Sequence, residues 1–309
     1  MRIGVVGMGA IGGFLAAKLA AQGAEVAALA RGATLEALRA DGLTLISRTG
    51  DVSVRLAAVS DAAADLGPVD LWLFTVKGQD SEAAADAIAP AVGPATRVLS
   101  FQNGLFGLEV LTRRFGAERV LGGVTYVPAT VERPGLVRHT GPVTRCVFGP
   151  SAGGGSDEAA NRFAALAQQA GLDIALLDDP TPEIWAKFVM LAPFHCVAAT
   201  TRLALGAWRA CPETLALFRT GMEEVAAVAA AKGVALPDGL IARNMAFTLE
   251  TADPGTRASM LDDLERGKPL ELDSSIGWLL QQARALDVPA PMHAACYALL
   301  KPYAEGPPG

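Results

Sequence analysis

Cysteine and histidine are scarce in this chain of 309 residues, which contains four cysteines and three histidines. The cysteines lie far apart and form no C-x-x-C pair; they are Cys146, Cys196, Cys211 and Cys296. This spacing fits neither a zinc site nor a disulfide framework. Because histidines are few as well, we expect no metal site.

Positive charge and long apolar runs are also lacking. The formal net charge is −6 at pH 7 and no basic tract stands out, which argues against nucleic acid as a partner. No apolar run approaches the ~20 residues of a membrane span. The first apolar stretch is short and broken by glycines, unlike a signal peptide. We therefore expect a cytoplasmic protein without a membrane partner.

Hydrophobic residues, by contrast, make up 51% of the chain, and alanine-rich segments recur at 62–64, 83–85 and 226–231. This composition suits closely packed helices in an α/β protein. The length allows one large domain or two medium ones, each with a core of its own. The alanine-rich helices could also supply the interface of a homodimer.

The first 13 residues carry the most specific pattern. The apolar run 3–6 predicts a buried strand, a G-x-G-x-x-G turn follows it, and residues 14–19 have a helical pattern. A strand, a glycine turn and a helix in this order form the dinucleotide-binding fingerprint of a Rossmann domain. The free N–H groups of the first helical turn would face the phosphates. The expected cofactor-binding residues are Gly7, Met8, Gly9, Ala10, Ile11 and Gly12.

The second predicted strand, 25–30, ends at Arg31. An NAD site has an Asp or Glu at this position to hold the ribose hydroxyls. A guanidinium instead holds a 2′-phosphate through paired, charge-assisted hydrogen bonds, and a carboxylate would repel that phosphate. Arg31 therefore indicates NADP(H) as the cofactor. The alternative is a solvated loop arginine.

Two further predicted strands, 69–76 and 98–101, end next to candidate ligand residues. Lys77 follows the first strand and Asn103 follows the second. In doubly wound sheets ligands lie beyond the carboxyl ends of the strands, where the glycine turn also lies. The alternatives are a solvated loop lysine for Lys77 and a left-handed Asn-Gly turn for Asn103.

The other elements of this half are predicted around turns. After a helix at 34–40, segments 43–46 and 52–56 form a hairpin that we expect to be appended to the parallel sheet. Strands at 120–130 and 144–149 close this half, with a turn at 133–135 between them. A flexible loop at 151–156, a helix at about 157–170 and a strand at 173–177 follow. Two acids and two prolines at 178–182 then place the domain boundary, with domains 1–179 and 180–309.

Strand signals nearly vanish after residue 183. Apolar residues recur at helical spacing in five segments, 183–204, 212–232, 238–250, 270–286 and 291–303. The sequence therefore predicts an α/β protein with an N-terminal Rossmann-type doubly wound sheet and a C-terminal all-helical domain. A cleft between the two is the expected place for a substrate.

Two charged residues stand out in the helical half. Lys187 lies in the apolar run 184–190, where helical spacing puts it beside Ile184 and Met190. Such a lysine either reaches out to water or works in a cleft, where partial burial lowers its pKa toward acid–base chemistry. Glu271 lies in the segment 269–273 and is a second candidate site residue. The alternative interpretation is a solvated acidic residue on a helix.

Across nearly its whole length the chain resembles the ketopantoate reductase (2-dehydropantoate 2-reductase) family. The matching segments occur in the family's order and are 7–12, 30–32, 75–77, 102–104, 183–187, 258–263 and 271–273. The resemblance implies NADPH-dependent reduction of ketopantoate to pantoate in pantothenate biosynthesis. It implies that Lys187 donates a proton or hydrogen bond to the keto oxygen, and that Glu271 holds the substrate hydroxyl and helps to set the lysine.

The resemblance also implies that Asn103 and Lys77 lie at the nicotinamide and substrate side of the site, and that Ser259 contacts the substrate carboxylate. One departure concerns the helix after Lys187. Family members that reduce ketopantoate typically carry asparagines four and eight residues after the lysine, but this chain has Leu191 and His195.

This departure leaves the substrate open. Leu191 cannot hydrogen-bond a hydroxyl or a carboxylate, and losing a polar contact can change substrate preference greatly. His195 either compensates as a substrate contact or is a hydrogen-bonded core histidine. Pro193 is expected to kink or break the helix between them. The alternatives are a same-fold NADPH-dependent reductase of a different 2-oxo acid or ketone and a non-catalytic NADP(H)-binding sensor.

Overall fold

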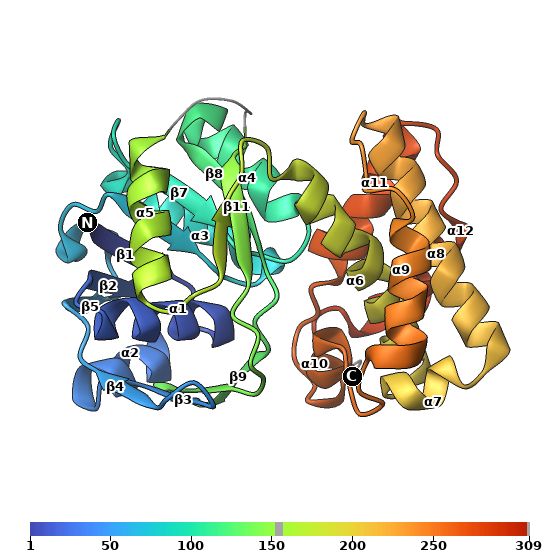
Figure 1. Ribbon diagram of the computed structural model, residues 1–309, viewed down its shortest axis with the longest axis horizontal. Coiled ribbons are helices and arrows are strands. Elements are labelled where there is room, and N and C mark those ends of the chain that lie inside the picture. Colours follow the sequence, from blue (N-terminus) through green and yellow to red (C-terminus); the bar gives the residue numbers. More distant parts are fainter. Residues whose placement is uncertain (152–156, 308–309) are drawn as a thin grey trace. The chain divides into compact units, whose positions relative to one another are not determined.

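The computed structural model describes residues 1–151 and 157–307, so most of the loop expected at 151–156 lies outside the described residues. The chain divides into two compact units. The first, here called the α/β unit, comprises Met1–Gln102 and Gly107–Pro180. The second, the helical unit, comprises Asn103–Phe106 and Thr181–Gly309. The predicted combination of a doubly wound sheet and an all-helical region is confirmed (Figure 1).

An eight-stranded sheet forms the centre of the α/β unit, in the strand order β12-β11-β8-β7-β6-β1-β2-β5. The strands from β5 to β8 in this order are parallel, whereas β11 is antiparallel to β8 and parallel to β12. Strands β1 and β6 are almost wholly buried, which explains their continuous apolar runs. The bounds are β1 (Arg2–Val6), β2 (Glu25–Leu29), β5 (Ala58–Ser60), β6 (Leu71–Phe74), β7 (Arg97–Ser100), β8 (Val120–Thr125), β11 (Cys146–Pro150) and β12 (Ile174–Leu176).

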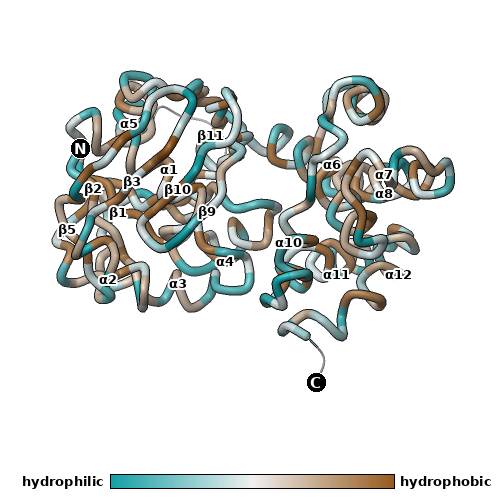
Figure 2. The backbone as a smooth tube through the Cα atoms, turned by 90° about the horizontal axis from the view of Figure 1, so that it is seen from below, coloured by the Kyte–Doolittle hydropathy of each residue, from teal (hydrophilic) through white to brown (hydrophobic). Residues whose placement is uncertain are grey.

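Helices and short helical turns connect these strands. Apolar residues concentrate on the central strands and on α1, as the hydropathy colouring in Figure 2 shows. The α-helices are α1 (Ala10–Ala21), α2 (Gly32–Ala40), α3 (Ser81–Ile88), α4 (Phe106–Phe115) and α5 (Glu158–Gln169). The 3₁₀ turns are η1 (Ala63–Leu66), η2 (Gly78–Asp80), η3 (Ala89–Ala91) and η4 (Ala117–Arg119).

A second sheet, in the order β4-β3-β10-β9, corrects the predicted place of the hairpin. Strands β3 (Leu43–Ser47) and β4 (Val52–Val54) do pair antiparallel, but β3 then pairs with β10 (Leu136–His139) and not with the parallel sheet. Alternate residues of β3 are buried, and the small sheet packs on α1. Alternation predicted a half-buried strand, but it carries no information about which sheet the strand joins.

The segment predicted as one strand at 120–130 is divided between the two sheets. Strand β8 ends at Thr125, and β9 (Ala129–Arg133) begins after Pro128 and pairs with β10 in the small sheet. Proline cannot donate to a strand ladder, so Pro128 is a natural place for the break. The predicted turn at 133–135 is present, because Gly135 has a φ of +75° and separates β9 from β10.

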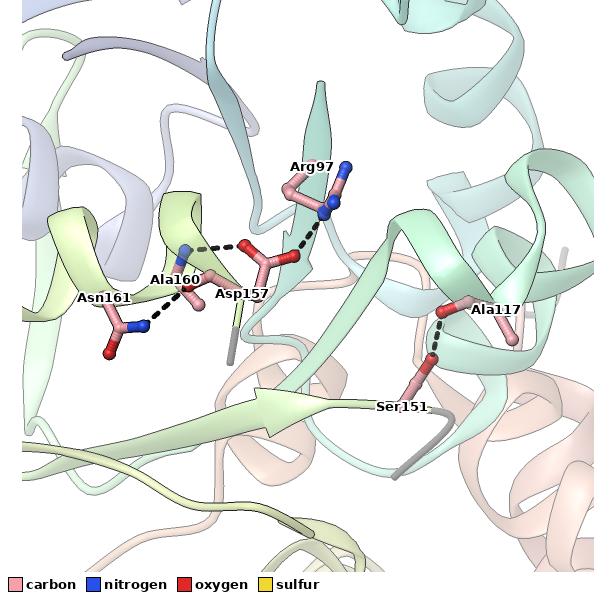
Figure 3. A network of polar contacts seen from close by, with 6 residues as sticks. All are labelled: Arg97, Ala117, Ser151, Asp157, Ala160 and Asn161. Atoms are coloured by element: carbon pink, nitrogen blue, oxygen red, sulfur yellow. Dashed lines mark hydrogen bonds and ion pairs between the residues drawn. The ribbon is translucent and has the colours of Figure 1, made fainter. Parts of the chain in front are cut away.

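Polar contacts anchor the chain at the start of α5 and at the end of β11 (Figure 3). Asp157 caps α5, since its carboxylate accepts a hydrogen bond from the Ala160 N–H at 2.9 Å. The same carboxylate pairs with Arg97 of β7. The Ser151 hydroxyl donates to the carbonyl oxygen of Ala117 at 3.2 Å. The Asp157–Arg97 pair thus joins α5 to β7, and the Ser151 hydrogen bond joins the end of β11 to η4.

Helices α6 (Thr181–Thr201) and α8 (Pro212–Ala231) pack against each other in the helical unit, and α10 (Ser259–Glu265) and α12 (Pro291–Leu300) pack on α6. Helices α7 and α10 were not predicted, because each is too short to show a clear helical period. The remaining elements are α7 (Leu205–Arg209), α9 (Leu240–Ala246), the π-helical turns η5 (Phe247–Thr251) and η6 (Asp273–Gly277), α11 (Trp278–Ala285) and the 3₁₀ turn η7 (Lys301–Tyr303).

Pro193 does not break helix α6, although a kink or a break was expected there. The helix continues through Pro193, because this residue is buried against α8, where a Cβ added to Gly221 would lie 2.5 Å from the proline Cβ. Close packing therefore holds the helix although one backbone hydrogen bond is lost. The described residues contain one helix that is long and apolar enough to cross a membrane, and this helix is α6. In the protein, 61% of its most apolar stretch is buried. A core helix has this composition as well.

Candidate functional site

The glycine turn lies between β1 and α1, and two of its three glycines are required by the protein's own backbone. Gly7 has a φ of +95°, and an added Cβ would lie 2.4 Å from the Val76 nitrogen. A Cβ on Gly12 would lie 2.1 Å from the carbonyl oxygen of Gly7. The Thr75 hydroxyl donates to that same oxygen at 2.8 Å and so ties the turn to the end of β6. Larger residues would displace this backbone.

Gly9 differs, because an added Cβ there would meet no atom within 4 Å. Gly9 is the N-cap of α1, its position supplies no side-chain cap, and the first helical bond runs from the Gly13 N–H to the Gly9 carbonyl. The N–H groups at 10–12 therefore have no acceptor within the helix. Packing does not require a glycine at position 9, whereas the close approach of a phosphate to the positive end of α1 would require one. Met8, Ala10 and Ile11 complete this turn and are half-buried.

Arg31 lies directly after β2, as the N-cap residue of α2. Its side chain is 82% exposed, and its Nη2 lies 3.0 Å from the Asp80 Oδ1 in the turn that follows β6. A salt bridge this exposed contributes about 0–1 kcal/mol to stability, so it directs the guanidinium without burying it. Asp80 is not among the predicted site residues, because its only sequence signal is its place three residues after Lys77.

Lys77 lies at the carboxyl end of β6 and is exposed. Because Gly7 approaches the backbone of Thr75 and Val76, Lys77 lies close to the glycine turn. The α/β unit thus brings together the predicted residues of the glycine turn, Arg31 and Lys77 at one edge of the sheet. This is the edge at which doubly wound sheets bind ligands.

Asn103 belongs to the helical unit, although it follows β7 of the α/β unit in the sequence. Its Oδ1 accepts a hydrogen bond from the Lys187 Nζ at 2.8 Å. The Asn103-Gly104 pair does form a turn with a left-handed residue, which is Gly104 with a φ of +77°. A Cβ added to Gly104 would lie 3.4 Å from the Phe188 ring, so the loop passes close to α6.

Lys187 is half-buried on α6 and lies next to an aromatic cluster. The ring centroids of Trp185 and Phe188 lie 6.0 Å apart, and that of Trp278 of α11 lies 5.8 Å from Trp185 and 6.0 Å from Phe188. Such a cluster holds this part of α6 rigidly against α11. The ammonium group therefore projects from a fixed backbone toward a fixed hydrogen-bond acceptor.

Glu271 is half-buried and lies in the turn just before η6. Its carbonyl oxygen accepts a hydrogen bond from the Ser275 N–H at 3.1 Å, which connects the residue to the π-helical turn. π-Helical turns are rare in proteins overall, but those that occur are often found at functional sites. The half-buried position differs from that of a fully solvated helix acid.

His195 lies two turns after Lys187 on α6 and is only 3% exposed. Its Nε2 lies 3.3 Å from the hydroxyl oxygen of Ser259, the first residue of α10. Burial, and to a lesser degree the charge of Lys187, lower the pKa of His195 to about 4. This environment is that of a neutral, hydrogen-bonded core histidine. Leu191 lies one helical turn after Lys187 and one turn before His195, and it is half-buried.

Comparison with known proteins identifies the family. A family model described as ketopantoate reductase PanE/ApbA matches residues 3–153, and the model of its C-terminal region matches residues 179–304. A 2-dehydropantoate 2-reductase of Mesorhizobium japonicum is 36% identical to this chain over 326 residues, with 97% of each chain covered.

Solved structures agree with these matches. A PanE/ApbA family ketopantoate reductase from Ralstonia eutropha has a TM-score of 0.89 at 32% identity, with 98% of each chain covered. D-Mandelate dehydrogenase, solved with NADH and anilino(oxo)acetate, has a TM-score of 0.89 at 21% identity and therefore shares the fold. The chain belongs to the ketopantoate reductase family and is an oxidoreductase of the 2-dehydropantoate 2-reductase type that works with a nicotinamide cofactor.

Proposed function

We propose that this protein reduces a 2-oxo acid with NADPH, and that the substrate is 2-dehydropantoate (ketopantoate), which is converted to pantoate for pantothenate biosynthesis. The observation that carries this proposal is the 2.8 Å hydrogen bond from the Lys187 Nζ to Asn103. It places an oriented cation on a rigid, half-buried helix face. The 36% identical 2-dehydropantoate 2-reductase supports the choice of substrate.

The residues at the carboxyl edge of the sheet fit a phosphorylated dinucleotide. The N–H groups that follow Gly9 would hold the pyrophosphate. Arg31 would hold the 2′-phosphate, since its exposed guanidinium directs only one nitrogen to Asp80. Lys77 lies at the same edge and adds positive charge. When bound, the reduced nicotinamide supplies the hydride.

The side chains of the helical unit supply the rest of the chemistry. Addition of hydride to a ketone builds negative charge on its oxygen, which a positioned cation stabilises. The Lys187 ammonium has three N–H donors, and Asn103 accepts one of them. In the bound complex Lys187 would donate a hydrogen bond to the keto oxygen and then transfer a proton to it. Glu271 would accept a hydrogen bond from the substrate hydroxyl.

One observation favours a second substrate. Leu191 presents an apolar side chain one helical turn after Lys187, and it is half-buried. A 2-oxo acid or ketone with an apolar group in place of the ketopantoate hydroxyl would suit this side chain better, because no polar group would lose its partner. The reaction at the carbonyl would be the same.

A panel of 2-oxo acids separates these two substrates. We expect kcat/KM with NADPH to be highest for ketopantoate, and 2-oxoisovalerate, which lacks the hydroxymethyl group, serves as the matched control. If kcat/KM is instead about tenfold higher for 2-oxoisovalerate than for ketopantoate, the apolar 2-oxo acid is the preferred substrate. Absence of turnover with every 2-oxo acid and ketone in the panel, despite measurable NADPH binding, would contradict a reductase.

A further inference from the structure

His195 and Ser259 form an isolated polar contact between α6 and α10. The two atoms, Nε2 and Oγ, lie 3.3 Å apart. A small buried apolar cluster lies next to both residues in the sequence and consists of Ala198, Ala258 and Leu261 with Phe194 packed against it. The imidazole is buried, whereas Ser259 is exposed. The contact therefore connects the protein interior to a surface hydroxyl.

The burial of His195 determines which ring nitrogen carries the proton. With a pKa of about 4 the ring is neutral near pH 7, so it holds one proton. Its Nδ1 is buried and has no hydrogen-bond partner among the described residues. A buried N–H without an acceptor is rarer than a buried acceptor without a donor. The proton therefore lies on Nε2, the nitrogen that faces Ser259.

This tautomer sets the polarity of Ser259. The Nε2–H donates to the Ser259 Oγ, so the proton of the serine hydroxyl cannot point at the imidazole. It points away, toward the exposed side of the side chain. A hydroxyl normally acts as donor or acceptor as its partner requires. Here the histidine makes it a donor.

We infer that His195 is a positioning residue that orients Ser259 to donate a hydrogen bond to an anionic oxygen of the substrate. This inference rests on the proposed reduction of a 2-oxo acid, whose carboxylate is the acceptor. His195 itself does not touch the substrate. An asparagine at this position would offer both a donor and an acceptor to Ser259, whereas the neutral imidazole offers only the donor.

Paired substrates test this role. The His195→Phe variant keeps a planar ring but loses the donor, and His195→Gln keeps an N–H donor. We expect His195→Phe to lower the ratio of kcat/KM for a 2-oxo acid to that for its methyl ester by about tenfold, mainly through KM for the acid, because a hydrogen bond to a charged group is lost. The glutamine variant should restore most of this ratio. An unchanged ratio in His195→Phe would overturn the inference.

Ser259→Ala provides the matched comparison. If His195 acts through the serine, this variant lowers the acid-to-ester ratio as His195→Phe does, and the double variant lowers it no further. Independent, multiplying effects of the two substitutions would contradict the inference. A merely structural role of His195 would reduce both substrates' kcat/KM alike.

The tautomer can be measured even where a variant does not fold. Long-range ¹H–¹⁵N correlation spectra of the intact wild-type protein distinguish a protonated Nε2 from a protonated Nδ1, and we expect the Nε2–H pattern for His195. The Nδ1–H pattern would overturn the inference. If the wild type reduces no 2-oxo acid, the proposed function fails, and this spectrum still decides the orientation of Ser259.

Discussion

The glycine turn of the α/β unit and helix α6 of the helical unit present their functional groups in opposite ways. The turn uses backbone N–H groups, and its glycines lie where a single added methyl group would collide with backbone or fill open space. Helix α6 uses side chains one and two turns apart, and their partners come from distant segments, Asn103 and α10. The turn is therefore sensitive to added atoms, whereas the helix is sensitive to removed ones.

The two regions also differ in whether a single residue contributes to stability, to ligand binding, or to both. In the turn, neighbouring glycines serve different purposes, because Gly12 permits close packing and Gly9 faces open space. On α6, a buried residue such as His195 contributes to both, since it contacts the interior and an exposed hydroxyl. Substitutions in the glycine turn should therefore change either stability or binding, whereas a substitution of His195 should change both.

The largest expected effect is on α6. Lys187→Ala should lower kcat about 10³-fold, because the charge that develops on the keto oxygen loses its cation and its proton donor. The affinity for NADPH should stay within about threefold, since the cofactor is assigned to the glycine turn. Steady-state kinetics and a fluorescence titration with NADPH measure both. Lys232→Ala is the control, because Lys232 is an exposed lysine of the same unit whose Nζ donates to the Gln282 Oε1 at 2.6 Å. A kcat of Lys187→Ala within tenfold of the wild type would remove the mechanism.

Two alanine substitutions in the glycine turn test whether stability and binding separate there. Gly12→Ala should lower the free energy of unfolding by about 3 kcal/mol, because its Cβ would lie 2.1 Å from a carbonyl oxygen. Gly9→Ala should change it by less than about 0.5 kcal/mol while raising the Kd for NADPH about tenfold. Urea unfolding and cofactor titration of both variants give the two quantities. Equal loss of stability in both would show that the turn does not separate the two functions.

The pH dependence of stability sharpens the view of α6. The pKa of His195 falls from 6.5 to about 4 on folding, mainly through burial, so the unfolded chain binds a proton that the folded chain does not bind. This contribution to stability is present above pH 6.5 and is lost as the pH falls toward 4. Between pH 7 and pH 5 the loss should be about 2 kcal/mol. The wild type should therefore lose this much more than His195→Gln in urea unfolding at the two pH values; parallel losses would mean that His195 titrates normally.

The smallest expected effect concerns cofactor choice. Arg31→Ala should raise KM for NADPH about tenfold and leave KM for NADH nearly unchanged, because only NADPH carries the 2′-phosphate. Arg39 of α2 is also exposed and donates to the Val59 carbonyl, so Arg39→Ala is the matched control. An unchanged preference for NADPH in Arg31→Ala would leave Arg31 as a solvated loop residue.

The elements that the sequence predicted well are those with a local cause. The strand, turn and helix of residues 2–21 follow from an apolar run and three glycines within six positions. The long helices α6 and α8 follow from their helical spacing of apolar residues. Short helices such as α10 were not predicted, because seven residues contain too few turns to show a helical period of apolar residues.

The errors arose where distant segments decide. Strand β3 joins β10 rather than the parallel sheet, because its buried face packs on α1. Pro193 does not break α6, because α8 packs closely against it at Gly221. In both cases the local pattern was compatible with several arrangements, and packing with residues far along the chain selected one.

The sequence by itself determined the α/β class of the first half, the helical second half, the glycine turn and the identity of the charged candidates, because backbone sterics and side-chain periodicity act over a few residues. Only the tertiary structure decided their partners. Asn103 contacts Lys187 across 84 residues, and His195 contacts Ser259 across 64. Such pairs depend on how whole helices and loops pack, and no local pattern encodes that packing.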